Sequence, residues 1–482
     1  MRIIVILFLC LGSISIANAQ ELESLNFIDS YSQTEVGNLI GISVSYGVDL
    51  YKVRYYTDDI NGNQSIASGL LCVPQADDLI FPLAAYQHGT VNGRQDVPSR
   101  LAGGFQLPLI LASYGYVVCA PDMLGLGDSP GIHLYVHAET QATAAIDMLS
   151  AIRDNDDQQD MYQVNDQLFV TGYSQGGHAA MALHKEIEEN YSDLFEVTAS
   201  APMSGPYSMY EEMVKFTLGD EEYASVSYLA WVVLSYQLAY PDLLGDYSLE
   251  DIFKSAYIDD ILAFKNEEIG RSELNIRMTV ELMNTVGRVT PKDMMHDSIV
   301  EGLRNDPNHP FSQALRDNDV FDWVPQAPMR MYYCVGDDQI VYTNATKADS
   351  VMNARGAQDV EAIQSDLFTP LDHGGCVLPA SFNGILFFQN FQNILTSTEE
   401  IRFDPNVSIY NSNEYLWVNI PNSYSSENLR LMIYDLSGAL ILIQNIESGQ
   451  STFEMNTLTQ GMFVVHIRTD QQIVKSQKIV RF

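Results

Sequence analysis

Hydrophobic and polar residues alternate regularly from about residue 40 to residue 395. Five short runs are almost continuously apolar, as strands buried on both faces of a sheet are: FPLAAYQ (81–87), GYVVCAP (115–121), QLFVTGY (167–173), EVTASAPM (196–203) and MRMYYCVG (329–336). Amphipathic segments such as 137–154 separate them and carry their apolar residues on one helix face. This pattern predicts an α/β fold in which helices flank a mainly parallel sheet.

The pattern changes after residue 398. Segments beyond this point alternate apolar and polar residues at a period of two, with turn residues between them, which predicts a small all-β sandwich over 399–482. The whole chain has 25 Lys and Arg against 62 Asp and Glu, whereas residues 401–482 have six against seven. We therefore expect two domains, with the acidic excess concentrated in the larger one at 20–398.

The first 19 residues have the composition of a secretory signal peptide. Arg2 precedes an apolar run at 3–11, and the tripeptide Ala-Asn-Ala at 17–19 is a small-residue cleavage site before Gln20. A stable transmembrane helix needs about 20 apolar residues, so this run is too short to be one. The sequence therefore predicts export from the cytoplasm.

The net charge of the chain is −37. A surface with this excess of carboxylates repels nucleic acid and anionic membranes. Neither is an expected partner, and most of the charge is expected to lie on a solvated surface.

A glycine-flanked serine follows the third apolar run. The segment TGYSQGG (171–177) contains the pattern G-x-S-x-G, formed by Gly172, Ser174 and Gly176, between a strand and a helix-like run. A nucleophilic serine stands above the strand end where backbones approach closely, and glycine on both sides relieves that crowding. We predict that Ser174 is a nucleophile and that the amide of Gln175, at the helix N-terminus, is an oxyanion donor.

A serine nucleophile requires a base and an acid, which in this arrangement come from later strand ends. The run at 329–336 leads into Asp337 and Asp338, and QSDLFTPLDHGGC (364–376) contains a histidine in a glycine-flanked loop. We predict that this histidine, His373, is the general base and that Asp337 orients it. Asp338 is the alternative acid.

The loop after an early strand offers a second oxyanion donor. YQHGT (86–90) ends a strand in His88 and Gly89, and the following amide, that of Thr90, can face the charge that develops on the substrate. The alternative is an ordinary glycine turn. His88 and Gly89, with the two elbow glycines, are predicted to support the site.

These motifs together resemble the α/β-hydrolase superfamily. HGT, PDMLGLGDS, GYSQGG, GDDQIV and DHGG occur in the order of that family, within about 80–395. The wording of YQHGT and GYSQGG, together with a large insertion, is similar to the secretory lipase and esterase branch.

The insertion extends over about 207–325, before the acid-bearing strand. Its run YASVSYLAWVVLSYQLAY (223–240) has polar interruptions, which argue against a membrane span. We expect a helical cap over Ser174, whose Tyr, Met and Leu side chains form an apolar pocket that suits esters better than charged peptides.

The end of the chain resembles an export domain. YDLSG (434–438), TLTQGMFVVHI (457–467) and a basic end are similar to the C-terminal sorting domain of type IX secretion substrates, although FDPN (403–406) departs from the usual opening. The resemblance implies recognition by the type IX secretion machinery and a secreted or cell-surface location. A carbohydrate-binding sandwich is the alternative.

Four cysteines remain outside the signal peptide. Cys72 and Cys119 lie inside apolar runs, which favours buried free thiols, whereas Cys334 and Cys376 lie close to the predicted acid and base and are the better candidate pair. An oxidising compartment permits a disulfide without determining which cysteines pair.

The sequence predicts a serine hydrolase that cleaves a small-molecule or lipid carboxylic ester through an acyl-enzyme. This chemistry needs no cofactor or metal, and the sequence has no HExxH motif or Cys/His cluster with metal-ligand spacing. Three alternatives stay open: a serine peptidase similar to proline-specific aminopeptidases, an esterase acting on acylated polysaccharides or phenolic esters, and a non-catalytic binding protein on the same scaffold.

Overall fold

The computed structural model describes residues 21–76, 79–155, 161–396, 400–401, 404, 406–412, 414–425, 428–435, 440–469 and 472–481. The predicted signal peptide (1–19) lies outside these residues, as do the predicted boundary at 398–399 and parts of the FDPN and YDLSG segments. The chain divides into two compact units, Met1–Ile394 and Leu395–Phe482. Each unit is described by itself.

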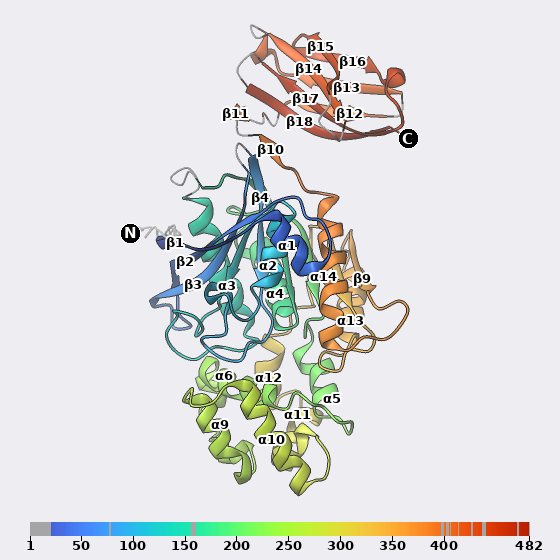
Figure 1. The fold of residues 1–482 in the computed structure, drawn as a ribbon. Helices are drawn as coiled ribbons and strands as arrows, with labels where there is room; N and C mark the ends of the chain where they lie inside the picture. Colours follow the sequence, from blue (N-terminus) through green and yellow to red (C-terminus); the bar gives the residue numbers. More distant parts are fainter. Residues whose placement is uncertain are drawn as a thin grey trace, which may run out of the picture. The chain divides into compact units, whose positions relative to one another are not determined.

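The larger unit is built on a mixed sheet with the strand order β1-β2-β3-β5-β4-β6-β7-β8-β9 (Figure 1). The strands are β1 (Leu22–Tyr31), β2 (Val48–Asp58), β3 (Gln64–Pro74), β4 (Leu79–Gln87), β5 (Val117–Pro121), β6 (Val164–Tyr173), β7 (Val197–Met203), β8 (Met329–Tyr333) and β9 (Val360–Gln364). Pairing is antiparallel from β1 to β5 and parallel from β5 to β9. The mainly parallel α/β sheet predicted from the apolar runs is thus confirmed, and the antiparallel edge β1–β3 adds to it.

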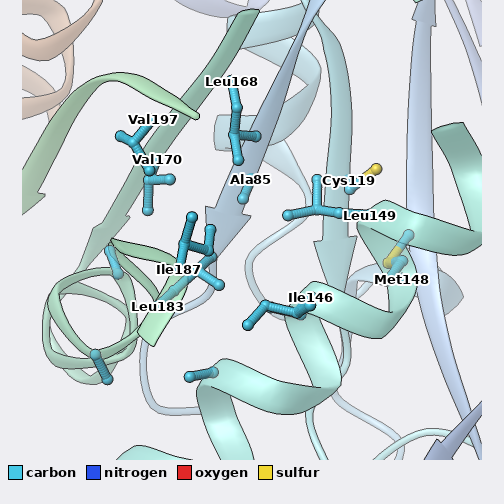
Figure 2. Packing of buried hydrophobic residues seen from close by; sticks show 14 of the residues in the cluster. Ala85, Cys119, Ile146, Met148, Leu149, Leu168, Val170, Leu183, Ile187 and Val197 are labelled. Atoms are coloured by element: carbon cyan, nitrogen blue, oxygen red, sulfur yellow. The ribbon is translucent and has the colours of Figure 1, made fainter. Parts of the chain in front are cut away.

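Helices cover both faces of this sheet. One face packs against α3 (Ala138–Arg153), α4 (Gln175–Asn190) and α13 (Thr343–Ala354), and the other against α1 (Gln33–Ile40), α2 (Gln106–Ser113) and α14 (His373–Gln389). Successive strand residues alternate between the two cores, as Leu70 and Leu71 do. Figure 2 shows Leu149 of α3 and Leu183 of α4 directed at the strands. This two-sided burial explains the continuous apolar runs, since each buried side chain of this size contributes about 1.5–3 kcal/mol.

A helical cap is inserted between β7 and β8, and in Figure 1 most of its helices gather below the sheet. A π-helical turn, η3 (Met209–Met213), leads into α5 (Val214–Thr217), α6 (Ser227–Ala239), α7 (Pro241–Leu244), α8 (Leu249–Ile252), α9 (Ile258–Lys265), α10 (Arg271–Thr285), α11 (Asp297–Asn305) and α12 (Pro310–Asp317). The cap has an apolar core of its own, which includes Trp231 and Phe253. Across the described parts of the chain, no helix combines the length and apolarity needed to cross a membrane.

The smaller unit consists of β-strands in two sheets. One sheet has the order β11-β18-β17-β14-β15 and the other β12-β13-β16. The strands are β11 (Glu400–Ile401), β12 (Ser408–Asn411), β13 (Tyr415–Ile420), β14 (Leu429–Asp435), β15 (Leu440–Ile446), β16 (Gly449–Glu454), β17 (Gly461–Arg468) and β18 (Gln472–Arg481). Alternate residues such as Leu416 and Val418 face one shared core, which confirms the predicted all-β fold of this region.

A carboxyl group between α3 and β2 makes the stability of the larger unit depend on pH. The buried hydroxyl of Thr57 donates to Asp147 Oδ2 at 2.6 Å. Burial raises the pKa of Asp147 from 3.8 to about 7, the charge of Asp58 raises it further, and the Thr57 hydrogen bond lowers it. The folded state therefore binds this proton more tightly than the unfolded state does. Its contribution to stability is fully present below about pH 4 and is lost as pH rises towards 7.

We expect Asp147→Asn to increase the free energy of unfolding at pH 8 and to change it little at pH 4. The gain is at most roughly 4 kcal/mol, because one pKa unit corresponds to about 1.36 kcal/mol. Urea unfolding at the two pH values measures the difference, and Asp166→Asn, which changes an exposed carboxylate, is the control. An equal effect at both pH values would contradict the prediction.

Candidate active site

Ser174 lies at the sharp turn that joins β6 to α4. Its φ of 63° and ψ of −123° are unusual for a residue with a side chain, and such conformations cost about 1–3 kcal/mol. The flanking glycines are required by close approach. A Cβ at Gly172 would lie 2.2 Å from the carbonyl oxygen of Gly176, and a Cβ at Gly176 would lie 1.9 Å from that of Gln87. The predicted elbow glycines therefore let the turn close and present the serine hydroxyl.

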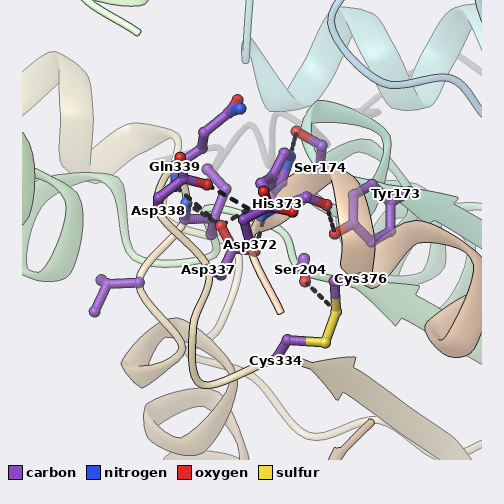
Figure 3. Close-up of polar contacts among 12 residues, drawn as sticks. Tyr173, Ser174, Ser204, Cys334, Asp337, Asp338, Gln339, Asp372, His373 and Cys376 are labelled. Atoms are coloured by element: carbon purple, nitrogen blue, oxygen red, sulfur yellow. Dashed lines mark hydrogen bonds and ion pairs between the residues drawn. A yellow bond between two sulfur atoms is a disulfide. The ribbon is translucent and has the colours of Figure 1, made fainter. Parts of the chain in front are cut away.

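His373 and Asp337 form a hydrogen-bonded series with this hydroxyl (Figure 3). His373 Nε2 lies 2.8 Å from Ser174 Oγ, and Nδ1 lies 2.9 and 2.8 Å from the two carboxylate oxygens of Asp337. Because a carboxylate only accepts, Nδ1 donates its proton to Asp337 and Nε2 is left to accept the serine proton. The three predicted residues thus come together, although they are far apart in the sequence.

The alternative acid, Asp338, makes a different contact. Its Oδ1 accepts the backbone amide of His373 at 3.0 Å, so it holds the start of α14 and not the imidazole ring. Asp337 is kept in place because its Oδ1 also accepts the amides of Gln339 and Ile340, at 3.0 and 2.8 Å. His373 itself is the first residue of α14, where the sequence predicted a loop, because Asp372 caps this helix by accepting the amide of Gly375 at 2.7 Å.

The residue before the nucleophile also holds the histidine. The hydroxyl of Tyr173 donates to the carbonyl oxygen of His373 at 2.6 Å, as Figure 3 shows. Burial raises the pKa of Tyr173, so its hydroxyl stays protonated and able to donate. The sequence gave no signal for this contact, because Tyr173 occupies a variable position of the G-x-S-x-G pattern.

Both predicted oxyanion donors lie beside Ser174. A Cβ at Gly89 would be 3.6 Å from Ser174 Cβ and 3.1 Å from the carbonyl oxygen of Tyr173, which places the loop after β4 against the elbow. Within the described residues, neither the Thr90 amide nor the Gln175 amide donates to another protein group. Two amides that approach one serine without a partner are what an oxyanion site requires.

The side chain of Gln175 is held by a histidine that sequence reasoning did not select. Gln175 Nε2 lies 2.7 Å from His133 Nε2, while His133 Nδ1 lies 2.8 Å from the carbonyl oxygen of Leu124. Burial lowers the pKa of His133 to about 3, so its ring is neutral and Nε2 can accept the amide proton of Gln175. His133 therefore fixes the residue that supplies one oxyanion donor.

Comparison with known proteins supports the same fold. Residues 106–294 match the family model described as "Serine aminopeptidase, S33", and residues 398–481 match the "Secretion system C-terminal sorting domain". Among solved structures, a putative hydrolase from Legionella pneumophila is 27% identical with a TM-score of 0.66, covering 77% of this chain and 98% of its own. The larger unit is an α/β-hydrolase.

Two further structures place this α/β-hydrolase among esterases and lipases by fold. The rice cell wall degrading esterase LipA from Xanthomonas oryzae is 23% identical with a TM-score of 0.67, covering 77% of this chain and 98% of its own. Lipase A from Candida antarctica is 14% identical with a TM-score of 0.55, covering 73% and 77%. No curated protein sequence matches the chain. The resemblance to the α/β-hydrolase superfamily, with a type IX sorting domain at the C-terminus, is thus confirmed.

Two cavities lie between the hydrolase core and its cap. The smaller, about 90 Å³, is lined almost wholly by apolar and aromatic side chains. It adjoins the site through Tyr135, whose hydroxyl is 2.8 Å from Thr90 Oγ1, and through Ile340 beside the acid. The larger, about 260 Å³, is bounded by His133, Trp231 and polar residues of the loop at 92–96. Tyr135 and Trp231, stacked at 4.8 Å between their ring centroids, line one cavity each.

A disulfide joins the two segments that carry the acid and the base. Cys334 precedes Asp337 by three residues, and Cys376 follows His373 by three; their sulfur atoms are bonded, as the yellow bond in Figure 3 shows. Cys72 and Cys119 are buried free thiols, as predicted. The bond therefore links the acid loop directly to α14.

We expect the double variant Cys334→Ser, Cys376→Ser to lose about 4 kcal/mol of the free energy of unfolding. The bond closes a loop with a sequence separation of 42, and its removal restores that conformational freedom to the unfolded chain. Urea unfolding of both proteins measures the loss. Reductant should destabilise the wild type and leave the double variant unchanged, and equal midpoints without reductant would contradict the prediction.

Proposed function

We propose that the protein is a secreted serine hydrolase that cleaves carboxylic esters through an acyl-enzyme intermediate. The observation that carries this proposal is the continuous series Asp337–His373–Ser174, placed beside two unpartnered amides. Ser174 and His373 are 6% and 7% exposed, so the charges that develop during the reaction form in a largely water-excluded place. Electrostatic stabilisation is strongest in such surroundings.

The first step is acylation. Ser174 Oγ attacks the ester carbonyl while its proton moves to His373 Nε2, and Asp337 stabilises the imidazolium through the proton on Nδ1. The amides of Gln175 and Thr90 bind the oxyanion of the tetrahedral intermediate. The intermediate collapses when His373 gives its Nε2 proton to the departing alkoxide, which leaves as the alcohol.

Deacylation repeats this chemistry with water. His373 Nε2 takes a proton from a water molecule as its oxygen attacks the acyl carbonyl, and the same two amides bind the second oxyanion. The proton then returns from His373 to Ser174 Oγ as the bond between the acyl carbon and the serine oxygen breaks. The carboxylic acid leaves, and the resting hydrogen bonds are restored.

The apolar cavity favours a short acyl chain. Its volume of about 90 Å³ is well below the roughly 300–1,000 Å³ of sites for drug-sized ligands. Met209, Met213 and Leu218 from the cap contribute to an apolar wall that suits a hydrocarbon chain. We therefore expect butyrate esters to be turned over faster than palmitate esters.

The larger cavity bears on the part of the substrate that leaves. Aromatic walls from Trp231 and Phe264 combine there with hydrogen-bonding residues such as Asn92 and Gln95, a combination that suits a sugar hydroxyl ester. This observation favours acylated polysaccharide as a second candidate substrate. The name of the Xanthomonas protein, a cell wall degrading esterase, is in line with this candidate.

The peptidase alternative requires an unpaired carboxylate for the substrate amine. Glu267 lines the larger cavity, but Arg94 contacts it at 2.6 Å, so its charge is already neutralised. We therefore favour esters over peptides, although the matched family model bears the name of an aminopeptidase.

Export is also part of the proposal. The sorting domain at 398–481 leads to recognition by the type IX secretion machinery, and the predicted signal peptide would direct the chain across the inner membrane first. A chain truncated after residue 394 should accumulate in the periplasm instead of at the cell surface or in the medium. Cell fractionation followed by immunoblotting tests this expectation.

The deciding experiment compares substrate classes. The mature protein is assayed on p-nitrophenyl acetate, butyrate, octanoate and palmitate, on acetylated xylan, and on a prolyl anilide, with Ser174→Ala as the background control. Ester turnover that peaks at short chains supports the proposal. Turnover confined to the anilide would replace it with the peptidase, and turnover confined to xylan would select the polysaccharide esterase.

A further inference from the structure

His88, at the end of β4, faces a carbonyl oxygen with each of its ring nitrogens. Nδ1 lies 2.8 Å from the carbonyl oxygen of Gly89, and Nε2 lies 3.0 Å from that of Asp122. The residue is fully buried. Water is therefore not the partner of either nitrogen, and the two carbonyl groups are its hydrogen-bonding environment.

This environment selects one protonation state. A carbonyl oxygen only accepts hydrogen bonds, and a neutral imidazole has one N–H and one lone pair. A neutral His88 would hold its lone pair against a carbonyl lone pair at hydrogen-bonding distance, whichever tautomer formed. The imidazolium form, in which both nitrogens donate, satisfies both contacts.

A buried cation needs a buried counter-charge, and Asp122 provides it. Asp122 is also fully buried; its Oδ1 accepts the amide of Ser99 at 2.9 Å and its Oδ2 accepts the hydroxyl of Ser68 at 2.5 Å. The Ser68 oxygen itself accepts the amide of Asp128 at 2.9 Å, so its own proton is free to go to Asp122. Both carboxylate oxygens therefore accept, as an ionised carboxylate does.

The electrostatics around this pair point the same way. Burial raises the pKa of Asp122, and the charge of His88 and the hydrogen bonds from Ser68 and Ser99 lower it. His133 is the other titratable group that interacts with His88; burial lowers its pKa most, and the positive charge of His88 lowers it further. A neutral His133 and an ionised Asp122 both favour a positive charge on His88.

The position of this charge connects it to the reaction. His88 immediately precedes Gly89 and Thr90, the loop that approaches Ser174, and a Cβ at Gly176 would lie 2.8 Å from the carbonyl oxygen of His88. Its Nδ1 donates to Gly89, so the ring holds the same backbone that presents the Thr90 amide. A cation fixed behind an oxyanion donor stabilises negative charge in front of it.

We propose that His88 is a permanently protonated positioning residue, whose imidazolium, paired with Asp122, fixes the Thr90 amide and makes the oxyanion site electropositive. The inference rests on the proposed function for its catalytic consequence, but the protonation state of His88 does not depend on it.

The protonation state is measured by nitrogen NMR on the mature full-length protein labelled with ¹⁵N in its histidines. Comparison with the His88→Gln spectrum assigns the His88 signals. We expect both ring nitrogens to carry protons from pH 6 to pH 9. A neutral tautomer at pH 7 would overturn the proposal, whatever the activity of the variant.

The catalytic consequence is measured on the same variant. Gln can fill the site and donate to one carbonyl oxygen but has no charge, so His88→Gln should lower kcat for p-nitrophenyl butyrate by roughly 10- to 100-fold, with KM changed less than about threefold. Affinity for a trifluoromethyl ketone, whose adduct carries the oxyanion, should fall by the same factor as kcat/KM.

Two controls separate this proposal from a structural effect and from failure of the proposed function. His184→Gln changes another fully buried histidine, which contacts Ser200 and Glu188, and should leave kcat within about threefold while tolerating a similar loss of thermal stability. A fall in kcat for His88→Gln without a matching loss of inhibitor affinity would reject the oxyanion role. If Ser174→Ala retained activity, the ester mechanism would fail while the NMR result stood.

Discussion

Ser174→Ala is expected to lower kcat for p-nitrophenyl butyrate by roughly 10⁶-fold, because removal of the hydroxyl leaves His373 with no nucleophile to activate. Some acceleration over the uncatalysed reaction should remain, since the Gln175 and Thr90 amides still bind an oxyanion formed by attack of water. A residual rate of about 10³-fold over the spontaneous reaction is typical of such variants. The affinity for substrate should change little, because the side chain that is removed is small.

The measurement combines steady-state kinetics with covalent labelling. A fluorophosphonate should add once to the wild-type chain, on the peptide that contains Ser174, and not to the variant. Ser200→Ala is the matched control, since Ser200 is equally buried and its hydroxyl lies 2.8 Å from His184 Nδ1, in a different part of the sheet. Retained turnover in Ser174→Ala, or labelling of another serine, would contradict the assignment of the nucleophile.

Asp337→Asn is expected to lower kcat by about 10⁴-fold without preventing folding. The carboxylate of Asp337 accepts the proton of His373 Nδ1, which keeps Nε2 free to act as the base. An asparagine can present its NH₂ group to Nδ1 and so favour the tautomer with the proton on Nε2. That tautomer cannot accept the proton of Ser174 and leaves the developing imidazolium without its counter-charge.

The adjacent carboxylate provides the control for this prediction. Asp338→Asn keeps an oxygen that can accept the amide of His373, so we expect kcat to fall less than about 10-fold. The two single variants are compared on one ester at pH 8, with thermal unfolding to verify that both are folded. A larger loss for Asp338→Asn than for Asp337→Asn would reverse the assignment of the acid.

The arrangement of the strand ends was predictable because it follows from local patterns. Continuous apolar runs indicate strands buried on both faces, and the chain order of serine, acid and histidine places these residues at the carboxyl ends of neighbouring strands. The antiparallel strands β1–β3 were not predicted individually. β2 alternates buried and partly buried residues and contains Lys52 and Arg54, so it does not form a continuous apolar run.

The finer geometry of the site was not predictable, because it depends on contacts between distant residues. His133 is 42 residues from Gln175, and the Tyr173 hydroxyl contacts a residue 200 positions away. Asp337 and Asp338 are chemically identical neighbours, and only the backbone turn after β8 determines which carboxylate faces the imidazole ring. The two carbonyl groups around His88 likewise belong to residues whose positions become known only after folding.

The cytoplasm keeps thiols reduced, so the Cys334–Cys376 bond forms only after the chain has left it. Before export, the acid loop and α14 are joined by noncovalent contacts alone, and the precursor unfolds more readily. After export, oxidation locks the histidine and its acid together. Maturation of the enzyme is therefore linked in time to its delivery: the chain is least stable while it still has to cross a membrane, and becomes most stable in the compartment where it meets its substrates.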